Sequence, residues 1–252
     1  MHPPVSLSVI IVAKNEAHDI GDCIRSVKGL ATEVIVFDSG SSDGTQAICR
    51  ELGAKVVETD WPGFGAQKNR AIDAATGDWV LSLDADERVG DALRTEILAL
   101  LSGKPAHDVW RAPRSSSFCG KFMRHSGWWP DYVVRLFRRG AARFEGSIHE
   151  KLVHAGEVGT LASPILHLAI PALEESLEKM NSYSTAGARA LAEKGRTSSV
   201  ATAALRGFWM FFRVYFLKLG FLDGREGFVL AVLNAEGSFH KYAKLAFSPK
   251  SR

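Results

Sequence analysis

The amino-acid sequence predicts an α/β fold with a mostly parallel sheet, helices on both faces and a helical C-terminal extension. Up to residue 90, runs rich in Val and Ile alternate with helical patterns, and helices of about ten residues between such strands are typical of parallel sheets. After residue 101 the alternation stops. With 252 residues, 46% hydrophobic and 23% charged, the chain can form one large domain with an appendage.

The elements of the first half follow from hydrophobic periodicity and turn residues. Strands are expected at 9–12, 34–37, 55–57 and 79–83, and helices at 20–30, at 66–75 and in a segment that ends at 52. The turn 39–45 contains two glycines and offers Ser42 or Asp43 as the N-cap of the helix that ends at 52. Gly53 would stop that helix.

The segment 111–129 has a different character. It is rich in Ser, Gly, Arg and aromatic residues, so we expect an irregular, partly mobile insertion there. The β-branched and aromatic run that follows predicts a strand at 133–137.

Helices are expected in the last third of the chain. Pro171 suits a first helical turn, and the acidic Glu174 and Glu175 favour the start of a helix that reaches about residue 194. Further expected elements are a linker at 195–199, an aromatic-rich helical region to 222 and a second helix through Tyr242. The expected domains are therefore 1–170, which contains the sheet, and 171–252, a helical extension.

The net charge of +3 conceals a strong asymmetry along the chain. By region the charge is −7 over 1–100, +7 over 101–143, −2 over 144–200 and +5 over 201–252. The two basic zones favour a partner with phosphates, such as a nucleotide sugar, an anionic lipid surface or a nucleic acid. A solvated basic face is the alternative. No nucleic-acid recognition motif accompanies the basic residues, which disfavours a nucleic-acid binder.

Cysteine usage and apolar runs bear on the compartment. Cys23, Cys49 and Cys119 are an odd count without C-x-x-C spacing, which disfavours a disulfide framework or a structural zinc site and fits a reducing compartment. The apolar run 5–13 lacks a basic leader, so we interpret it as a strand and not as a signal peptide. The stretch 208–222 is too short and too charged for a membrane span. We therefore expect a cytoplasmic protein.

Carboxylates follow three of the expected strands: Glu16, Asp38 and the pair Asp84 and Asp86. Because ligands of parallel α/β sheets bind beyond the carboxyl ends of the strands, we expect these side chains to converge on one cleft. Two carboxylates two residues apart suit Mg²⁺ or Mn²⁺ shared with a diphosphate, and solvated turn carboxylates are the alternative. Asp38 is expected to accept a hydrogen bond from a nucleobase or a ribose hydroxyl, or else to form a turn.

Several motifs carry a family resemblance. They are SVIIVAKNE at 8–16, VIVFDSGSSDGT at 34–45, GFGAQKNRAI at 63–72 and WVLSLDADE at 79–87. Their order and spacing resemble the family 2 glycosyltransferases of the GT-A (Rossmann-like) fold. Later motifs are PDYVVRLFRR at 130–139, EGSIHEKL at 145–152 and GFLDGREGF at 220–228. These look like a bacterial branch containing the lipopolysaccharide core β-glucosyltransferases, which add glucose to an inner-core heptose.

The resemblance implies an inverting, metal-dependent glycosyltransferase that uses Mg²⁺ or Mn²⁺. UDP-glucose is the donor it implies, and a lipid-linked saccharide with an inner-core heptose is the implied acceptor. Another lipid-linked or protein acceptor is an alternative. A nucleotidyltransferase would also place acidic strand ends around a metal, but it normally adds a Gly-rich, basic phosphate loop, which residues 13–16 do not provide. A non-catalytic binding module is a further alternative.

The resemblance also implies roles for particular residues. Glu16 and Asp38 match strand ends that bind the nucleoside, and Lys68 falls where a basic residue can reach the diphosphate. Asp84 and Asp86 match the motif for the metal and the diphosphate.

The catalytic base is expected near the acceptor. An inverting transfer needs a carboxylate or a His within reach of the acceptor hydroxyl. Many family members carry a Glu-Asp pair where this chain has His149 and Glu150. We interpret Glu150 as the first candidate base, Asp131 as its rival, and His149 as a ligand for metal or phosphate.

Two regions are expected to surround the chemistry. The segment 111–129 could close over the donor and exclude water. Trp128 and Trp129 suit stacking on a sugar face or ordinary packing.

The C-terminal region carries aromatic residues that alternate with basic ones. The aromatic residues are Trp209, Phe211, Phe212, Tyr215, Phe216 and Phe221. With Arg206, Arg213 and Lys218 they predict an interfacial helix over 205–222 on an anionic membrane. We therefore expect a peripheral protein on the inner face of the bacterial inner membrane. Packing of the aromatic residues onto the α/β domain or onto a second subunit is the alternative.

Overall fold

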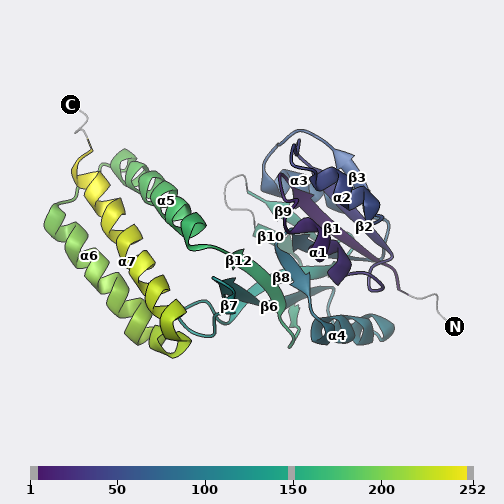
Figure 1. Ribbon diagram of the computed structural model, residues 1–252. Coiled ribbons are helices and arrows are strands. Elements are labelled where there is room, and N and C mark those ends of the chain that lie inside the picture. The colour runs from purple at the N-terminus through teal and green to yellow at the C-terminus, as the bar shows by residue number, and fades with distance from the viewer. Residues whose placement is uncertain (1–4, 147–150, 249–252) are drawn as a thin grey trace. The chain divides into compact units, whose positions relative to one another are not determined.

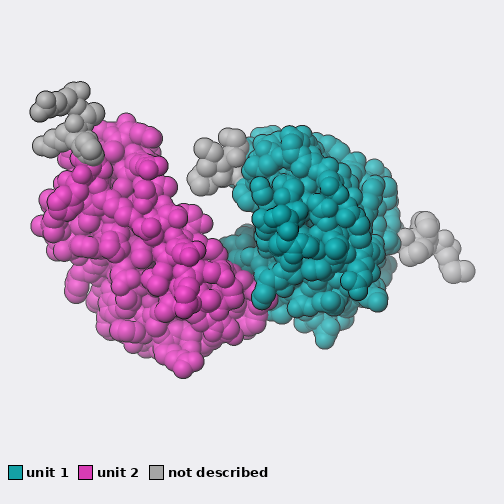
Figure 2. Space-filling model, turned by 45° about the horizontal axis from the view of Figure 1, so that its top comes forward, with its two compact units in different colours: residues 1–114, 131–167 teal, residues 115–130, 168–252 magenta. Residues whose placement is uncertain are grey.

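A computed structural model of the protein describes residues 5–146 and 151–248. The chain folds into two compact units (Figure 2). The first unit takes residues 1–114 and 131–167, and the second takes 115–130 and 168–252. The structure thus adds the segment 115–130 to the helical residues, and the expected domain boundary after residue 170 stays a prediction.

The first unit is built on a curled sheet in the strand order β3-β2-β1-β4-β8-β6-β12-β5. These strands are β1 (Leu7–Ala13), β2 (Glu33–Asp38), β3 (Lys55–Glu58), β4 (Trp79–Asp84), β5 (Glu87–Val89), β6 (Val109–Phe118), β8 (Asp131–Arg138) and β12 (Ile165–Ile170). The first four pair in parallel. Beyond them β8 pairs antiparallel with both β4 and β6, and β5 pairs antiparallel with β12. The predicted mostly parallel α/β sheet is confirmed, with an antiparallel side that the sequence did not indicate.

Three further strands belong to this unit. β9 (Ala142–Glu145) and β10 (Lys151–His154) pair antiparallel as a separate two-stranded sheet. β11 (Val158–Thr160) runs parallel to β6.

Helices cover both faces of the sheet, as predicted (Figure 1). The helices are α1 (Ile20–Ser26), α2 (Thr45–Glu51), α3 (Phe64–Ala74) and α4 (Asp91–Ser102). Side chains alternate along a strand, so Val9 and Ile11 of β1 pack with residues of α1, α2 and α4. Ile10 of the same strand packs with Ala71 and Ile72 of α3. Among the residues described, Cys23 and Cys49 are buried free thiols and Cys119 is an exposed one.

The expectation of an irregular insertion at 111–129 is wrong for much of that segment. Residues 109–118 form β6, which pairs with β8 through a register shift at Trp110 and Arg111. A short strand, β7 (Lys121–Phe122), folds back onto the end of β6. The polar composition of this segment does not indicate a loop, because Ser115, Ser116 and Ser117 are buried in spite of their polarity.

The second unit is largely helical. Its elements are α5 (Leu173–Glu193), α6 (Val200–Phe212), a π-helical turn η1 (Arg213–Leu217), a 3₁₀ turn η2 (Gly220–Asp223) and α7 (Gly224–Ala246). These positions confirm the helices expected after Pro171 and through Tyr242. Ser199 caps α6, where its Oγ accepts a hydrogen bond from the backbone N–H of Thr202 at 3.1 Å. A Cβ on Gly207 would lie 3.1 Å from Cβ of Phe239, so α6 and α7 pack closely there.

A buried carboxylate ties two distant segments of this unit together. Asp223 is 2% exposed. Its side chain accepts hydrogen bonds of 3.0 Å from the backbone N–H groups of Arg124 and His125 and from Oγ of Ser126. The segment that follows β7 is therefore held by the residue that precedes α7.

Candidate functional site

The carboxyl ends of β2 and β4 lie on either side of the end of β1. Ala13 is level with Asp38, and Val12 is level with Asp84. The parallel register thus brings the turns after three strands to one edge of the sheet, where the sequence predicts the ligand site.

Glu16 lies in the first of these turns. Its backbone N–H donates to Oγ1 of Thr45 at 2.8 Å. Burial and the charges of four neighbouring aspartates, first among them Asp86 and including Asp84, raise the pKa of Glu16 to about 7. The structure therefore brings Glu16, Asp84 and Asp86 together, in surroundings that favour a bound cation or proton.

A cavity of about 230 Å³ opens beside Glu16. It is lined by Val12, Ala13, Lys14, Glu16, Trp61 and Phe64. Trp61 and Phe64 are both about half exposed, and their rings meet edge to face with 4.6 Å between centroids. Sequence reasoning missed this aromatic pair, although Trp61 and Phe64 flank a Pro-Gly turn that directly precedes α3.

Asp84 is held by two cations. Nζ of Lys68 lies 3.0 Å from Oδ1 of Asp84, and Nη2 of Arg135 donates to Oδ2. Burial opposes ionisation of Asp84, but the charges of Arg135 and Lys68 outweigh it and hold the pKa of Asp84 well below its usual range. Lys68 is predicted to contact a diphosphate, and in this structure its ammonium is already paired with Asp84. In the described chain, Nε of Arg135 is buried without a hydrogen-bond partner.

Glu87 contacts two arginines, Arg135 and Arg114, and sequence reasoning missed it. It is fully buried, and its Oε1 accepts a hydrogen bond from Nη2 of Arg135 at 2.7 Å. Nη1 of Arg114 lies 3.6 Å from the same oxygen. Oε2 accepts a hydrogen bond from the backbone N–H of Asp84 at 3.0 Å. The signal for Glu87 was its place directly after the predicted metal pair.

Asp86 faces a histidine from a distant strand. Its Oδ2 lies 3.2 Å from Nε2 of His167, which belongs to β12. A carboxylate and an imidazole are donors that a divalent cation accepts. Over residues 5–146 and 151–248 no group of three or more such side chains is assembled. Asp86 and His167 are therefore two side chains of the type that binds a metal, and the predicted ligand His149 lies outside the described residues.

Glu150 and Asp131 are the two predicted candidates for the catalytic base. Glu150 lies outside the described residues. Asp131, 44% exposed, pairs through Oδ2 with Nη2 and Nε of Arg114 at 2.6 and 3.0 Å. Arg114 in turn approaches Glu87, so Asp131 joins the same network of charges as Asp84. Its role as a base stays a prediction.

Asp38 is a turn-forming carboxylate in this structure. It is buried, and it accepts hydrogen bonds from the backbone N–H groups of Gly40 and Ser41, from Oγ of Ser41 and from Nε2 of Gln46. Burial raises and these hydrogen bonds lower its pKa, with a net shift downward. Its contacts are those of a turn-forming residue, which was the alternative to a nucleoside-binding role. The contact of Asp38 with a nucleoside stays a prediction.

The two tryptophans expected at a sugar are both engaged within the second unit. Trp128 meets Phe118 edge to face, with 6.2 Å between centroids. The guanidinium of Arg124 lies 4.8 Å from the ring centroid of Trp129. These contacts match the packing alternative for Trp128, and sugar stacking stays a prediction for both.

The aromatic residues of the C-terminal region fall into two groups. Phe211 and Tyr215 stack at 5.3 Å between centroids, and both contact Phe228 of α7. Leu205, Phe208, Trp209, Phe212, Phe216 and Leu217 are exposed. In the described part of the chain, Val200–Leu217 has, by length and composition alone, what a membrane-crossing helix would need. The expectation against a span considered only 208–222 and does not hold for this longer apolar run. The structure thus leaves an apolar surface on α6 and η1 within the second unit, which we call the α6 apolar face.

Comparisons with known proteins match most of the chain. The model of the family described as glycosyl transferase family 2 matches residues 8–154. An "uncharacterized glycosyltransferase" of Rickettsia felis is 31% identical over 255 residues, which cover 95% of this chain and 89% of the relative. The lipopolysaccharide core biosynthesis glycosyltransferase LpsC of Rhizobium meliloti is 31% identical over 258 residues, which cover 97% and 93%.

A likeness to solved structures is more limited. The crystal structure of glucosyl-3-phosphoglycerate synthase from Mycobacterium tuberculosis in complex with Mn²⁺, UDP-glucose and phosphoglyceric acid is 28% identical. It covers 46% of this chain and 45% of that chain with a TM-score of 0.36. This likeness is too partial to carry ligands across.

Proposed function

Since the chain belongs to glycosyl transferase family 2, we propose that it transfers glucose from UDP-glucose to an inner-core heptose of lipopolysaccharide, with inversion at the sugar. The likeness to LpsC over nearly the full length of both chains supports the lipopolysaccharide acceptor. The observation that carries the proposal is the edge of the sheet where β1 and β4 end side by side, with Glu16 near Asp84 and Asp86 and in the wall of an aromatic cavity.

The donor is proposed to bind along this edge. Trp61 and Phe64 offer ring faces for a nucleobase, and stacking on aromatic side chains tolerates any base. Glu16 lines the same cavity and would accept hydrogen bonds from the nucleoside. Lys68 and Arg135, already gathered around Asp84, supply positive charge for the diphosphate.

A divalent cation fits the donors at the edge of the sheet. Asp86 and His167 would hold it, and oxygens of the diphosphate would complete its shell. A bound Mg²⁺ or Mn²⁺ would neutralise charge on the departing diphosphate. Asp84 suits this less well than the sequence predicts, because Lys68 and Arg135 already balance its charge.

Deprotonation of the acceptor hydroxyl is assigned to a carboxylate. Asp131 accepts both of its hydrogen bonds from Arg114 through Oδ2, so Oδ1 is the atom proposed to take the proton. Arg114 then orients the base, because its planar group fixes the plane of the carboxylate. Glu150 keeps its place as the other candidate base.

The acceptor is proposed to be reached at a membrane. Arg206, Arg213 and Lys218 are exposed on or directly after α6 and η1, and their cations suit anionic lipid. The guanidinium of Arg206 also lies 5.2 Å from the ring centroid of Tyr242. We place the enzyme in the cytoplasm, peripheral on the inner face of the inner membrane.

The test is a transfer assay with the purified full-length enzyme. UDP-glucose and other nucleotide sugars are offered at equal concentration with core lipopolysaccharide that ends in heptose, and the product is identified by mass spectrometry and NMR. We expect glucose in β-linkage, and no product from Asp86→Ala. The matched control Asp73→Ala removes an exposed carboxylate paired with Arg143 and should remain active. An α-linkage would overturn inversion. In a parallel reaction with nucleoside triphosphates, release of pyrophosphate would instead indicate a nucleotidyltransferase.

A further inference from the structure

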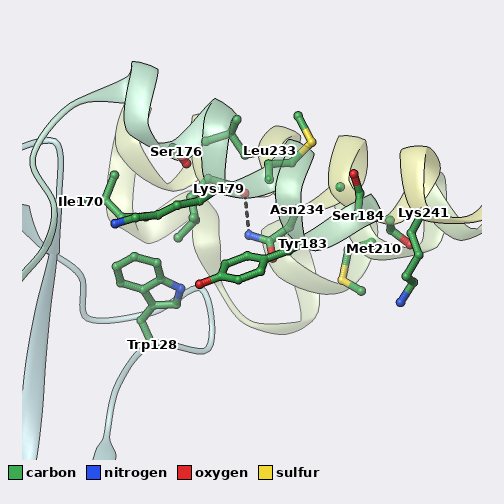
Figure 3. A pocket seen from close by; sticks show the side chains of 14 residues that line it. Trp128, Ile170, Ser176, Lys179, Tyr183, Ser184, Met210, Leu233, Asn234 and Lys241 are labelled. Carbon is green, nitrogen blue, oxygen red and sulfur yellow. Dashed lines mark hydrogen bonds between the residues drawn. The ribbon is translucent and has the colours of Figure 1, made fainter. Parts of the chain in front are cut away.

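The second unit contains a groove that the proposed chemistry does not use. It lies between α5 and α7, with a contribution from α6, and has a cavity volume of about 370 Å³ (Figure 3). Its apolar walls are Trp128, Ile170, Met180, Met210, Leu230 and Leu233. A cavity of this size lies within the range of about 300–1,000 Å³ that small-molecule sites occupy.

Three polar side chains of the groove are hydrogen-bonded within the second unit. Ser184, Asn234 and Ser238 each donate a hydrogen bond to a backbone carbonyl of their own unit, at 2.9, 2.8 and 3.3 Å. Their hydrogen-bonding capacity is partly spent, so the surface left for a ligand is mainly hydrocarbon. The two methionines, Met180 and Met210, can adapt to a flexible apolar ligand. The groove therefore favours an alkyl chain over a ligand that needs hydrogen bonds.

The groove is elongated along the helices. On α5 it extends from Ser176 to Ser184, which is about 12 Å at 1.5 Å per residue. On α7 it extends from Leu230 to Lys241, which is about 16 Å by the same rise. These lengths suit one extended chain better than a compact ring system.

A lysine stands at each end of the groove (Figure 3). Nζ of Lys179 lies 3.5 Å from the carbonyl oxygen of Ala169 and 3.7 Å from Glu175. At the other end, a Cβ on Gly187 would lie 2.8 Å from Cδ of Lys241. An exposed ion pair such as Lys179 with Glu175 contributes little, so Lys179 can exchange it for a ligand anion. Cations at the ends of a hydrocarbon groove complement a chain with an anionic head.

We infer that this groove binds one acyl chain of the lipid-linked acceptor, with an anionic headgroup beside Lys179, since the ammonium of Lys241 already lies 5.1 Å from the ring centroid of Tyr242. The inference rests on the proposed function for the identity of the lipid. The second unit would thus recognise the acceptor through its hydrocarbon part.

The first experiment measures binding without any transfer. Dodecyl phosphate, kept below its micelle-forming concentration, is titrated into the full-length enzyme by calorimetry, with inorganic phosphate and dodecyl maltoside as comparison ligands. We expect one site for dodecyl phosphate, weaker binding of the neutral maltoside and none of phosphate. No saturable binding of dodecyl phosphate overturns the inference.

Two variants locate the site. Met180→Trp fills the groove and should weaken dodecyl phosphate binding at least tenfold. Its matched control is Leu177→Trp on the same helix, since Leu177 is exposed and does not line the groove. Lys179→Glu changes only an exposed charge, so it remains informative if Met180→Trp does not fold, and it should weaken binding about fivefold or more. Equal affinity in Lys179→Glu and the wild type, or in Met180→Trp and Leu177→Trp, overturns the assignment.

A second experiment identifies the source of the chain. Transfer is compared with intact and deacylated core acceptors. In the wild type we expect a lower KM for the intact acceptor at similar kcat, and in Met180→Trp we expect the two KM values to converge. If Met180→Trp keeps the KM difference, the acceptor assignment is wrong and a bilayer lipid is the occupant. Transfer to the deacylated acceptor reports on the proposed function by itself, so failure of the groove and failure of the function are distinguished.

Discussion

Nε2 of His167 lies 3.2 Å from Oδ2 of Asp86, which brings an imidazole from β12 within reach of the turn after β4. If the two hold a divalent cation, either truncation should weaken binding of Mn²⁺ in the presence of UDP, by on the order of tenfold or more. Titration followed by electron paramagnetic resonance measures this. His240→Ala removes an exposed histidine of α7 and serves as the control. Unchanged Mn²⁺ binding in both His167→Ala and Asp86→Ala would show that the cation lies elsewhere.

Removing the buried charge of Glu87 should destabilise the fold. The change Glu87→Gln leaves the buried Arg135 with Asp84 as its remaining carboxylate partner. Breaking a buried pair in this way costs about 3–5 kcal/mol of unfolding free energy. Urea unfolding measures the loss. Asp131→Asn, which removes a partly exposed partner of Arg114, should cost less than about 1 kcal/mol. Similar small losses for both would mean that Asp84 alone satisfies Arg135.

Glu16 should make stability depend on pH. Its pKa of about 7 lies above the ordinary value of 4.5, so the folded state binds more protons than the unfolded state between these values. The free energy of unfolding contributed by Glu16 therefore falls as pH rises through this window and stays low above it. Glu16→Gln should gain stability relative to the wild type as pH rises from below 4.5 to above 7.

Urea midpoints at several pH values measure this gain. Glu51→Gln, on the exposed surface of α2, controls for the loss of one negative charge. A difference between Glu16→Gln and the wild type that does not change with pH would contradict the raised pKa.

The α6 apolar face should bind anionic vesicles. Each of Arg206, Arg213 and Lys218 contributes about 1 kcal/mol near a charged surface. Their joint replacement by Gln should weaken sedimentation with phosphatidylglycerol vesicles by on the order of 100-fold. Replacing the three basic residues within 189–196 gives a control of equal charge. Equal loss in both variants would mean that net charge, and not this face, drives binding.

The sequence predicted the first half of the sheet well because local signals determine it. Val9 to Val12, Val34 to Phe37 and Trp79 to Leu83 lie within β1, β2 and β4, since each is a buried run bounded by turn residues. Strand β6 escaped prediction because its buried serines and its arginines are satisfied by distant partners. Arg114, for example, pairs with Asp131, which stands in another strand.

Local sequence signals also predicted part of the candidate site. Asp84 and Asp86 were found from the strand that precedes them, and Glu16 from its place after β1. His167 carries no local signal, because a single histidine in an apolar strand resembles a core residue. Only the antiparallel pairing of β12 with β5 brings it to Asp86. Pairings between strands 80 residues apart cannot be read from local periodicity.

The hydrogen bonds that Asp223 accepts from Arg124, His125 and Ser126 affect how the chain is made. During synthesis, the residues after β7 emerge almost 100 positions before their partner. Phe118 and Met123 pack against α7. Their side chains therefore stay exposed until α7 has been translated. Contacts so distant in sequence slow folding and expose apolar surface to aggregation. A nascent chain that stalls before α7 would therefore be a substrate for chaperones.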